Sequence, residues 1–161
     1  MKIEFAKFSR YPRGTMYRLL EDAYSYEPAF KRDFDANWKD ADGFFCDHPD
    51  IADECGFITT ADGVPIGCIC WDPRHIPDYV ELGHNCVASR YKGLKIGNLQ
   101  LREAVRRILE KKVTVIRVTT NEALLPARKN YESVGFRLKG KRDDGALKAY
   151  SGALMDYELK A

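Results

Sequence analysis

The spacing of apolar residues along the chain predicts strands and helices in alternation. Apolar and polar side chains alternate over Lys2–Phe8, which indicates a strand. Apolar residues then recur at helical spacing over Thr15–Ala23, and again in a stretch that begins at Pro28. The Asp-rich stretch Asp40–Asp53 contains a glycine and a proline, so we expect a loop with short turns there.

The middle of the chain predicts a three-stranded meander. Two β-rich runs, Glu54–Thr60 and Val64–Trp71, flank the pair Asp62-Gly63, which is favoured in the tight turn of a hairpin. A third strand is expected over Tyr79–Val87.

The second half of the chain predicts a helix, a strand, a helix and two strands. The expected elements are a helix with Leu101, Ala104, Val105 and Ile108 on one face, a strand at Val113–Thr119, a helix at Leu124–Val134, and strands at Phe136–Lys139 and Ala149–Leu159 around a charged turn at Gly140–Gly145. There is no internal repeat and no low-complexity linker, so we expect one α/β domain over residues 1–161.

Composition narrows the class of protein. Hydrophobic residues make up 45% and charged residues 31%, as in soluble globular proteins. No apolar run approaches the ~20 residues of a membrane span, and the N-terminus lacks a secretory signal. Five cysteines form no disulfide framework and no Cys-x-x-Cys pair, which favours reduced thiols and argues against a zinc site. We therefore expect a cytoplasmic protein without a bound metal or a membrane partner.

Charge is distributed unevenly along the chain. The net charge is only +2, which argues against a dedicated nucleic-acid binder, and the basic run Lys139–Arg142 is short enough to be simply solvated. Residues 21–81, however, carry a net −11, and residues 82–161 carry a net +9. This asymmetry predicts two binding surfaces of opposite sign.

The basic half contains a candidate phosphate-binding turn between the strand that ends at Val87 and the next helix. Such a turn presents free backbone N–H groups at the positive end of the helix dipole. It holds Arg90, Lys92 and Lys95, and Gly93 allows a ligand to approach the backbone closely. Neither a Walker loop nor a Gly-x-Gly-x-x-Gly fingerprint occurs, so spacing alone also allows an ordinary turn with solvated lysines.

The segment Val87–Leu99 (VASRYKGLKIGNL) resembles the acetyl-CoA signature of the GNAT N-acetyltransferase superfamily. In that signature a strand ending in Val is followed by a Pro-x-Tyr-like stretch, which Tyr91 matches, and then by Arg/Gln-x-x-Gly-x-Gly/Ala at the start of a helix. Lys92 takes the Arg/Gln position, Lys95 takes the first glycine and Gly97 takes the second.

A second register of the signature remains open, in which Arg90 takes the Arg/Gln position and Gly93 takes the next defined position. It loses the match of Val87 and Tyr91. In either register one position departs from the pattern by a lysine.

A second, independent match lies downstream. Residues 126–136 (PARKNYESVGF) look like the family's Ala-x-x-x-Tyr-Glu-x-x-Gly-Phe segment. Ala127 and Tyr131 lie on the same face of a helix that ends at Gly135. Without the resemblance, this position would be interpreted as a core tyrosine at a helix end. The resemblance implies that the Tyr131 phenol lies near the CoA sulfur and protonates the leaving thiolate, and that Asn121 contacts the pantetheine.

The resemblance covers nearly the whole chain and implies the fold and the activity. The implied fold is α/β, with a central mixed, mostly antiparallel sheet of six to seven strands flanked by about four helices. The implied activity is transfer of an acetyl group from acetyl-CoA directly to a primary amine. The cofactor-binding residues that it implies are Cys86, Val87, Lys92, Gly93, Leu94, Lys95, Ile96, Gly97, Asn98, Asn121, Asn130 and Tyr131.

Three residues of one strand are candidates for the chemistry. We prefer Glu81 as the general base, directly or through water, over an inert surface carboxylate. Strict alternation places His84 on the opposite face, as a structural histidine, unless a bulge intervenes. Cys86 reads as a small buried residue, because no Cys–His pair would activate it. A bulge or splay beside Cys86 would expose backbone N–H groups to the thioester oxygen.

The acceptor is expected to be cationic because of the acidic segment, with residues 15–53 on the acceptor side. A polyamine, an aminoglycoside-like amine, or a lysine or N-terminal amine would fit. The alternatives are a non-catalytic acyl-CoA-binding regulatory module and, less favoured, a nucleotide-binding or phosphoribosyl-binding domain. Exposed sheet edges are compatible with a homodimer.

Overall fold

The computed structural model describes residues 1–143 and 152–161, which form a seven-stranded sheet and five α-helices. The strands are β1 Ile3–Ala6, β2 Gly56–Ala61, β3 Val64–Asp72, β4 Tyr79–Val87, β5 Val115–Asn121, β6 Arg137–Arg142 and β7 Leu154–Lys160. The helices are α1 Thr15–Ala23, α2 Pro28–Asp47, α3 Pro49–Glu54, α4 Ile96–Leu109 and α5 Leu125–Val134, with short 3-10 helices η1 Phe8–Arg10 and η2 Ser89–Tyr91.

The sheet has the strand order β1-β2-β3-β4-β5-β7-β6. Only β4 and β5 pair in parallel among the described strands, and the other five pairs are antiparallel. The expected mixed, mostly antiparallel sheet is therefore confirmed, as are the bounds of α1 and β4. The predicted hairpin joins β2 to β3 through Asp62 and Gly63, both of which have positive φ.

The expectation of a loop over Asp40–Asp53 is wrong, because α2 continues to Asp47 and α3 follows directly. The buried carboxylate of Asp42 accepts hydrogen bonds from the backbone N–H groups of Gly14, at 2.8 Å, and Tyr17, at 3.3 Å. Asp42 thus caps the first turn of α1 from a neighbouring helix. Tertiary contacts of this kind outweigh the weak helix propensity of aspartate, and they produce a fifth helix.

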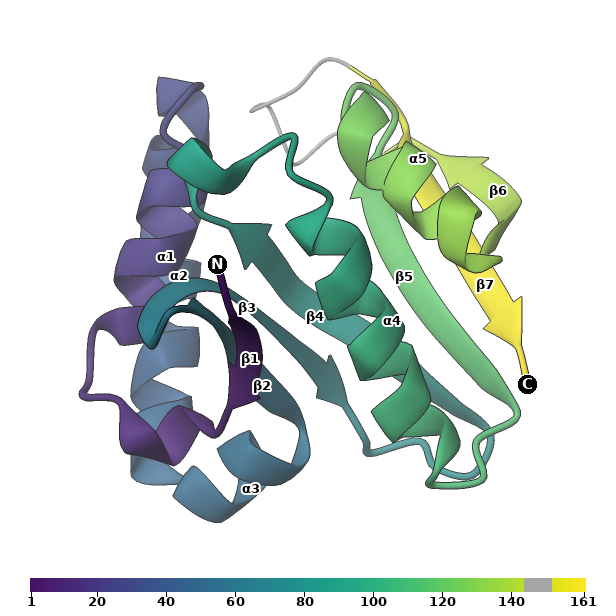
Figure 1. The fold of residues 1–161 in the computed structure, drawn as a ribbon. Coiled ribbons are helices and arrows are strands. Elements are labelled where there is room, and N and C mark those ends of the chain that lie inside the picture. Colours follow the sequence, from purple (N-terminus) through teal and green to yellow (C-terminus); the bar gives the residue numbers. More distant parts are fainter. Residues whose placement is uncertain (144–151) are drawn as a thin grey trace.

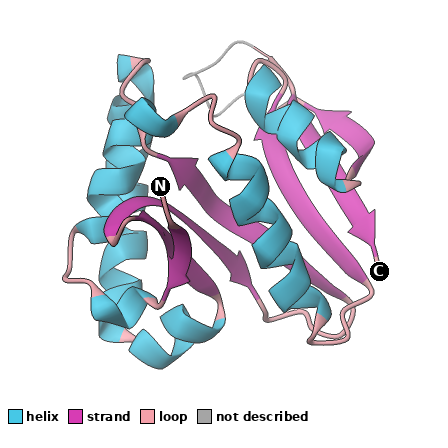
Figure 2. Ribbon diagram, in the orientation of Figure 1, coloured by secondary structure: helices cyan, strands magenta, loops and turns pink. Residues whose placement is uncertain are grey.

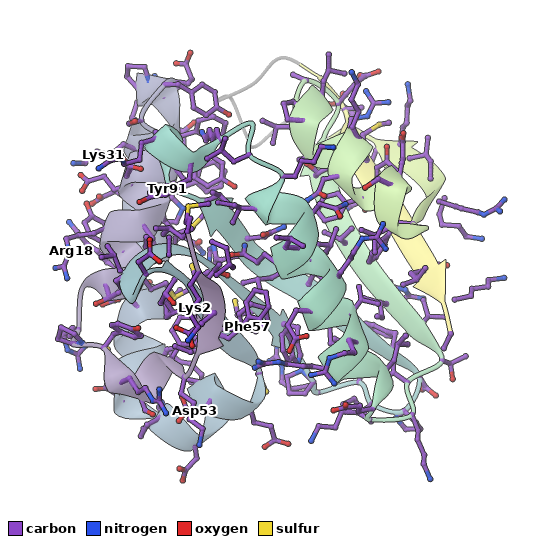
Figure 3. The ribbon with its side chains drawn as sticks, in the orientation of Figure 1. Lys2, Arg18, Lys31, Asp53, Phe57 and Tyr91 are labelled. Carbon is purple, nitrogen blue, oxygen red and sulfur yellow. The ribbon has the colours of Figure 1, made fainter. Side chains whose placement is uncertain are left out.

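Helices cover both faces of the sheet (Figures 1 and 2). Helices α4 and α5 pack on one face, over a core that draws on β2, β3, β4, β5 and β7. Helices α1 and α2 pack on the other face, over β2, β3 and β4. Phe57 of β2 is fully buried on the α4 side (Figure 3), where the guanidinium of Arg107 lies 4.5 Å from its ring centroid.

Several strand ends differ from the expected ones. Strand β1 stops at Ala6 because Phe8 turns into η1 and packs against Phe45, with ring centroids 5.0 Å apart. Strand β6 continues to Arg142, into the turn expected at Gly140–Gly145. The rest of that turn and the expected strand start at Ala149 lie outside the described residues. None of the described helices is long and apolar enough to cross a membrane.

Candidate active site

Strands β4 and β5 separate after a very short pairing. Tyr79–Glu81 pairs with Val115–Arg117, and beyond that the described strands make no ladder with each other. Figure 1 shows the two strands diverging toward the end at which α4 begins. Backbone groups on this edge of β4 therefore lack the partner that a continuous sheet would supply, so they can pair with an extended ligand.

Strand β4 also contains a β-bulge, in which Gly83 and His84 lie opposite the single residue Cys70 of β3. The extra residue shifts the alternation of side chains. Leu82, before the bulge, packs into the core beneath α4, and Asn85, after it, hydrogen-bonds to a side chain of α4. Leu82 and Asn85 therefore share a face although they are three residues apart.

Because of the bulge, Glu81 and His84 lie together on the face opposite α4. Strict alternation would have separated them, and the bulge named above as the exception to it is present. Cys86 follows on the same face and packs with α1 and α2. His84 is half-buried, and this burial lowers the pKa of its imidazole below the ordinary value. The ring is therefore neutral at neutral pH and can accept a proton.

The phenol of Tyr131 reaches the opening from the α5 side. Its ring is buried against Phe136 and Tyr157, with centroids at 5.7 and 6.3 Å. Asn85 Nδ2 donates to the phenol oxygen at 3.4 Å. Burial raises the pKa of Tyr131, and the hydrogen bond from Asn85 partly opposes that shift. The phenol therefore keeps its proton at neutral pH.

A second phenol, Tyr24, reaches the same strand from the opposite face. Its hydroxyl donates to the backbone carbonyl of Asn85 at 3.4 Å, and its ring stacks on Trp38 at 5.8 Å. Burial raises the pKa of Tyr24. No local sequence pattern singles out Tyr24, because its position depends on how α1 packs against β4.

The turn before α4 presents a run of unused backbone donors. Lys95 is the N-cap residue of α4 with φ 62°, and Gly93 has φ 80°. Among the described residues, none of the five N–H groups from Gly93 to Gly97 donates to another protein group. Lys95 thus adopts the left-handed conformation that the signature assigns to a glycine. The turn has the form of an anion site at a helix N-terminus.

Lys92 does not point into this turn. Its ammonium donates to the carbonyl of Ala23 and lies 4.5 Å from the ring centroid of Tyr26. Burial lowers the pKa of Lys92. Its side chain therefore joins this turn to the end of α1. Lys95 and Arg90 are both exposed, and the Arg90 guanidinium lies 5.6 Å from the ring centroid of Tyr91.

The remaining candidate cofactor-binding residues lie around the start of α4 and the turn after β5. Asn130 Nδ2 donates to the Gly97 carbonyl at 3.1 Å, and Asn98 Nδ2 donates to Ser133 Oγ at 2.8 Å, so α5 holds the first turn of α4. Ile96 is buried and packs with Val87, whereas Leu94 is exposed. Asn121 Oδ1 accepts from the N–H of Ala123 at 2.8 Å and shapes the turn after β5.

Cys86 lies in a buried thiol pair. Its Sγ is 3.6 Å from Sγ of Cys68, directly across the β3–β4 ladder. The hydrogen bond to Cys86 and burial raise the pKa of Cys68 well above its usual range. These are features of structural thiols rather than of nucleophiles. The described part of the chain contains no group of three or more His, Cys, Asp or Glu side chains placed to hold a metal.

Glu81 is exposed and lines an open depression of about 380 Å³ together with Tyr79, Arg117 and Thr119. Most carboxylates of residues 21–81 accept a hydrogen bond from a backbone N–H group or form an ion pair with a cation. Four have neither kind of contact with a described residue: Asp40, Asp50, Asp78 and Glu81. Most carboxylates of the acidic segment are therefore engaged in contacts within the fold. Glu81 is the one of these four that lies beside the β4–β5 opening.

The opened parallel pair, the buried phenol and the free N–H groups of the turn before α4 are compatible with a phosphorylated thioester as ligand. The family model described as the Acetyltransferase (GNAT) family matches residues 14–136, so the chain belongs to that family. It is therefore an acyltransferase with acetyl-CoA as its donor. A search of curated protein sequences found no match.

Solved structures share the fold at low sequence identity. The PaiA N-acetyltransferase from Thermoplasma acidophilum, in complex with coenzyme A, has a TM-score of 0.80 and 18% identity, with 100% of both chains covered. The ribosomal-protein-S18-alanine N-acetyltransferase from Escherichia coli has a TM-score of 0.73 and 14% identity, covering 99% of this chain and 94% of its own. A Bacillus subtilis acetyltransferase in complex with CoA has a TM-score of 0.71 and 15% identity, with 99% and 98% covered.

The two lysines of the turn should differ in their effect on CoA binding. We expect Lys95→Met to weaken CoA binding about threefold to tenfold, because Lys95 belongs to the turn, is exposed and forms no ion pair with a described residue. Lys92→Met should change the affinity less than about threefold and instead lower the melting temperature. Titration calorimetry and thermal unfolding measure both effects. A larger loss of affinity for Lys92→Met than for Lys95→Met contradicts this assignment.

Proposed function

We propose that this protein is an N-acetyltransferase that moves an acetyl group from acetyl-CoA directly to the primary amine of a cationic acceptor. The acceptor is a small molecule or a lysine or N-terminal amine. One observation carries the proposal: the gap between β4 and β5 has a protonated phenol on one side and an anion-binding helix terminus at its mouth.

The residues present fit acetyl-CoA, which supplies the acetyl group as a thioester. The free N–H groups of residues 93–97 and the N-terminus of α4 suit the diphosphate. The unpaired edge of β4 up to Cys86 and Val87 suits the amides of an extended pantetheine, with Asn121 across the gap. The N–H groups on that edge would also polarise the thioester carbonyl.

Tyr131 is assigned the role of general acid. Its phenol lies at Asn85, inside the opening, and retains its proton at neutral pH because burial raises its pKa. A proton held at the phenol oxygen can pass to the sulfur as the thiolate leaves. Direct transfer needs no protein nucleophile, which agrees with the structural character of Cys86.

Glu81 is assigned the role of general base, acting through water. It lies four residues before Asn85 on β4, roughly 13 Å along an extended strand, so direct contact with an amine at the Tyr131 end is out of reach. His84 shares its face, is neutral at neutral pH and lies closer, so it is the rival base. The unpaired carboxylate of Glu81 would also attract a cationic acceptor.

Activity can be tested by release of free CoA thiol from acetyl-CoA across a panel of cationic, neutral and anionic amines. We expect turnover with cationic amines, weakened by added salt. Tyr131→Phe should lower kcat about 10²-fold, because the leaving thiolate loses its proton donor, and should leave CoA affinity within about threefold. Binding of CoA without turnover of any amine, unaffected by Tyr131→Phe, would instead indicate the non-catalytic binding module.

The base can be identified from the pH dependence of kcat/KM for the amine. We expect Glu81→Gln to lower kcat/KM about 10²-fold and to remove the acidic limb of the profile, because an amide cannot accept the proton. His84→Gln should retain that limb. Asp78→Asn and His75→Gln are the matched controls, since both side chains are exposed and lie outside the opening. If His84→Gln removes the limb and Glu81→Gln keeps it, the base is His84.

A further inference from the structure

The side-chain amide of Gln100 on α4 is completely buried and contacts three neighbouring strands of the sheet, β2, β3 and β4. Three acceptors surround its Nε2 and share its two hydrogens: Oδ1 of Asn85 at 2.8 Å, and the backbone carbonyls of Cys68 at 3.0 Å and Cys86 at 3.1 Å. Its Oε1 accepts from the hydroxyl of Thr59 at 2.6 Å. A buried amide without partners is costly, and this one has four.

The fold makes room for this amide at Gly67 of β3. A Cβ at Gly67 would lie 2.7 Å from Gln100 Oε1 and 2.7 Å from the Cys86 carbonyl oxygen, so no larger residue fits without displacing one of them. The absence of a side chain at Gly67 therefore gives the Gln100 amide its place against the sheet. From there it contacts Asn85, the residue that also contacts the Tyr131 phenol.

The orientation of Gln100 follows from its partners. Backbone carbonyls can only accept hydrogen bonds, so the end of the amide that faces the carbonyls of Cys68 and Cys86 has to be the NH₂ group. The Asn85 atom that faces the same NH₂ group then has to be its carbonyl oxygen. This leaves the NH₂ group of Asn85 to face Tyr131, whose oxygen accepts.

We propose that Thr59, Gln100 and Asn85 form a hydrogen-bond relay of fixed direction that ends on the phenol oxygen of Tyr131 and leaves the phenol proton free. Each member donates toward the phenol: Thr59 to Gln100, Gln100 to Asn85, and Asn85 to Tyr131. Asn85 and Gln100 are thus positioning residues. The use of the free proton on the leaving sulfur rests on the proposed function, whereas the direction of the relay does not.

The direction has a chemical consequence. A donor to the phenol oxygen stabilises the phenolate more than the phenol, so it makes Tyr131 a better acid in a site where burial alone would make it a poor one. The reverse arrangement, with the phenol donating to Asn85, would hold the proton in place. The other titratable groups around Tyr131 are the phenols of Tyr24 on α1 and Tyr157 on β7.

The relay can be tested in the free protein by placing a fluorinated tyrosine at position 131. Fluorine lowers the pKa of the phenol, so its titration is complete while the protein is folded, and the fluorine NMR signal reports that site alone. We expect Asn85→Leu to decrease the ionisation constant of this phenol about tenfold, because the donor to the phenolate is lost. Asn85→Ala serves where the leucine variant does not fold.

Two control variants separate the relay from a general change in polarity. Thr59→Val removes only the far end of the relay, so the ionisation constant should fall by about twofold or less, in the same direction as for Asn85→Leu. Tyr157→Phe removes a polar group near the Tyr131 ring but outside the relay, and the constant should stay the same. An unchanged or increased constant in Asn85→Leu, or an equal fall in Tyr157→Phe, would overturn the proposal.

Kinetics connect the relay to the reaction. Asn85→Leu should lower kcat about tenfold and leave the KM for acetyl-CoA within about threefold. If Tyr131→Phe keeps full transferase activity, the assigned general acid is wrong, yet the fluorine titration still decides whether the relay exists. The two failures are therefore distinguishable.

Discussion

The separation of β4 from β5 is the constraint on which the site depends. Both strands continue well past their three paired residues, so their divergence leaves backbone donors and acceptors that a sheet would normally satisfy. Helices α4 and α5 pack on one face of the sheet, and α1 packs against β4 on the other. Two phenols, Tyr131 and Tyr24, contact Asn85 of β4 from these opposite faces.

At the turn before α4, the anion site that we propose rests on backbone geometry more than on side-chain charge. The lysines at the turn first suggested a cluster of phosphate-binding cations, but the ammonium of Lys92 is used within the protein. Five free N–H groups and the dipole of α4 remain, together with exposed Lys95. The charges of the acidic segment, residues 21–81, are likewise mostly used within the protein, because most of its carboxylates accept backbone hydrogen bonds or pair with cations. Of the carboxylates without such a partner, Glu81 lies beside the opening.

Local patterns predicted the fold well where structure is locally encoded. The periodicity of α1 and β4 gave their bounds, and the two family motifs gave the class of enzyme. Prediction failed where a contact between distant residues decides the outcome. Asp42 extends α2 because it caps α1. A bulge in β4 was an open alternative in the sequence, but only the pairing with β3 places it opposite Cys70, where it moves His84 to the face of Glu81. The sequence gives no signal for Gln100, because its role depends on the space that Gly67 leaves on a distant strand.

Hydrogen–deuterium exchange with and without saturating CoA tests most directly whether the opening holds the cofactor. Exchange at the amides of residues 82–87 and 93–97 should slow about tenfold or more when CoA is added, because their N–H groups gain acceptors. Exchange in β1 and β2 should not change. Unaltered exchange in both segments, or slowing confined to the separate depression lined by Phe8, Asp42 and Cys46, would contradict the account.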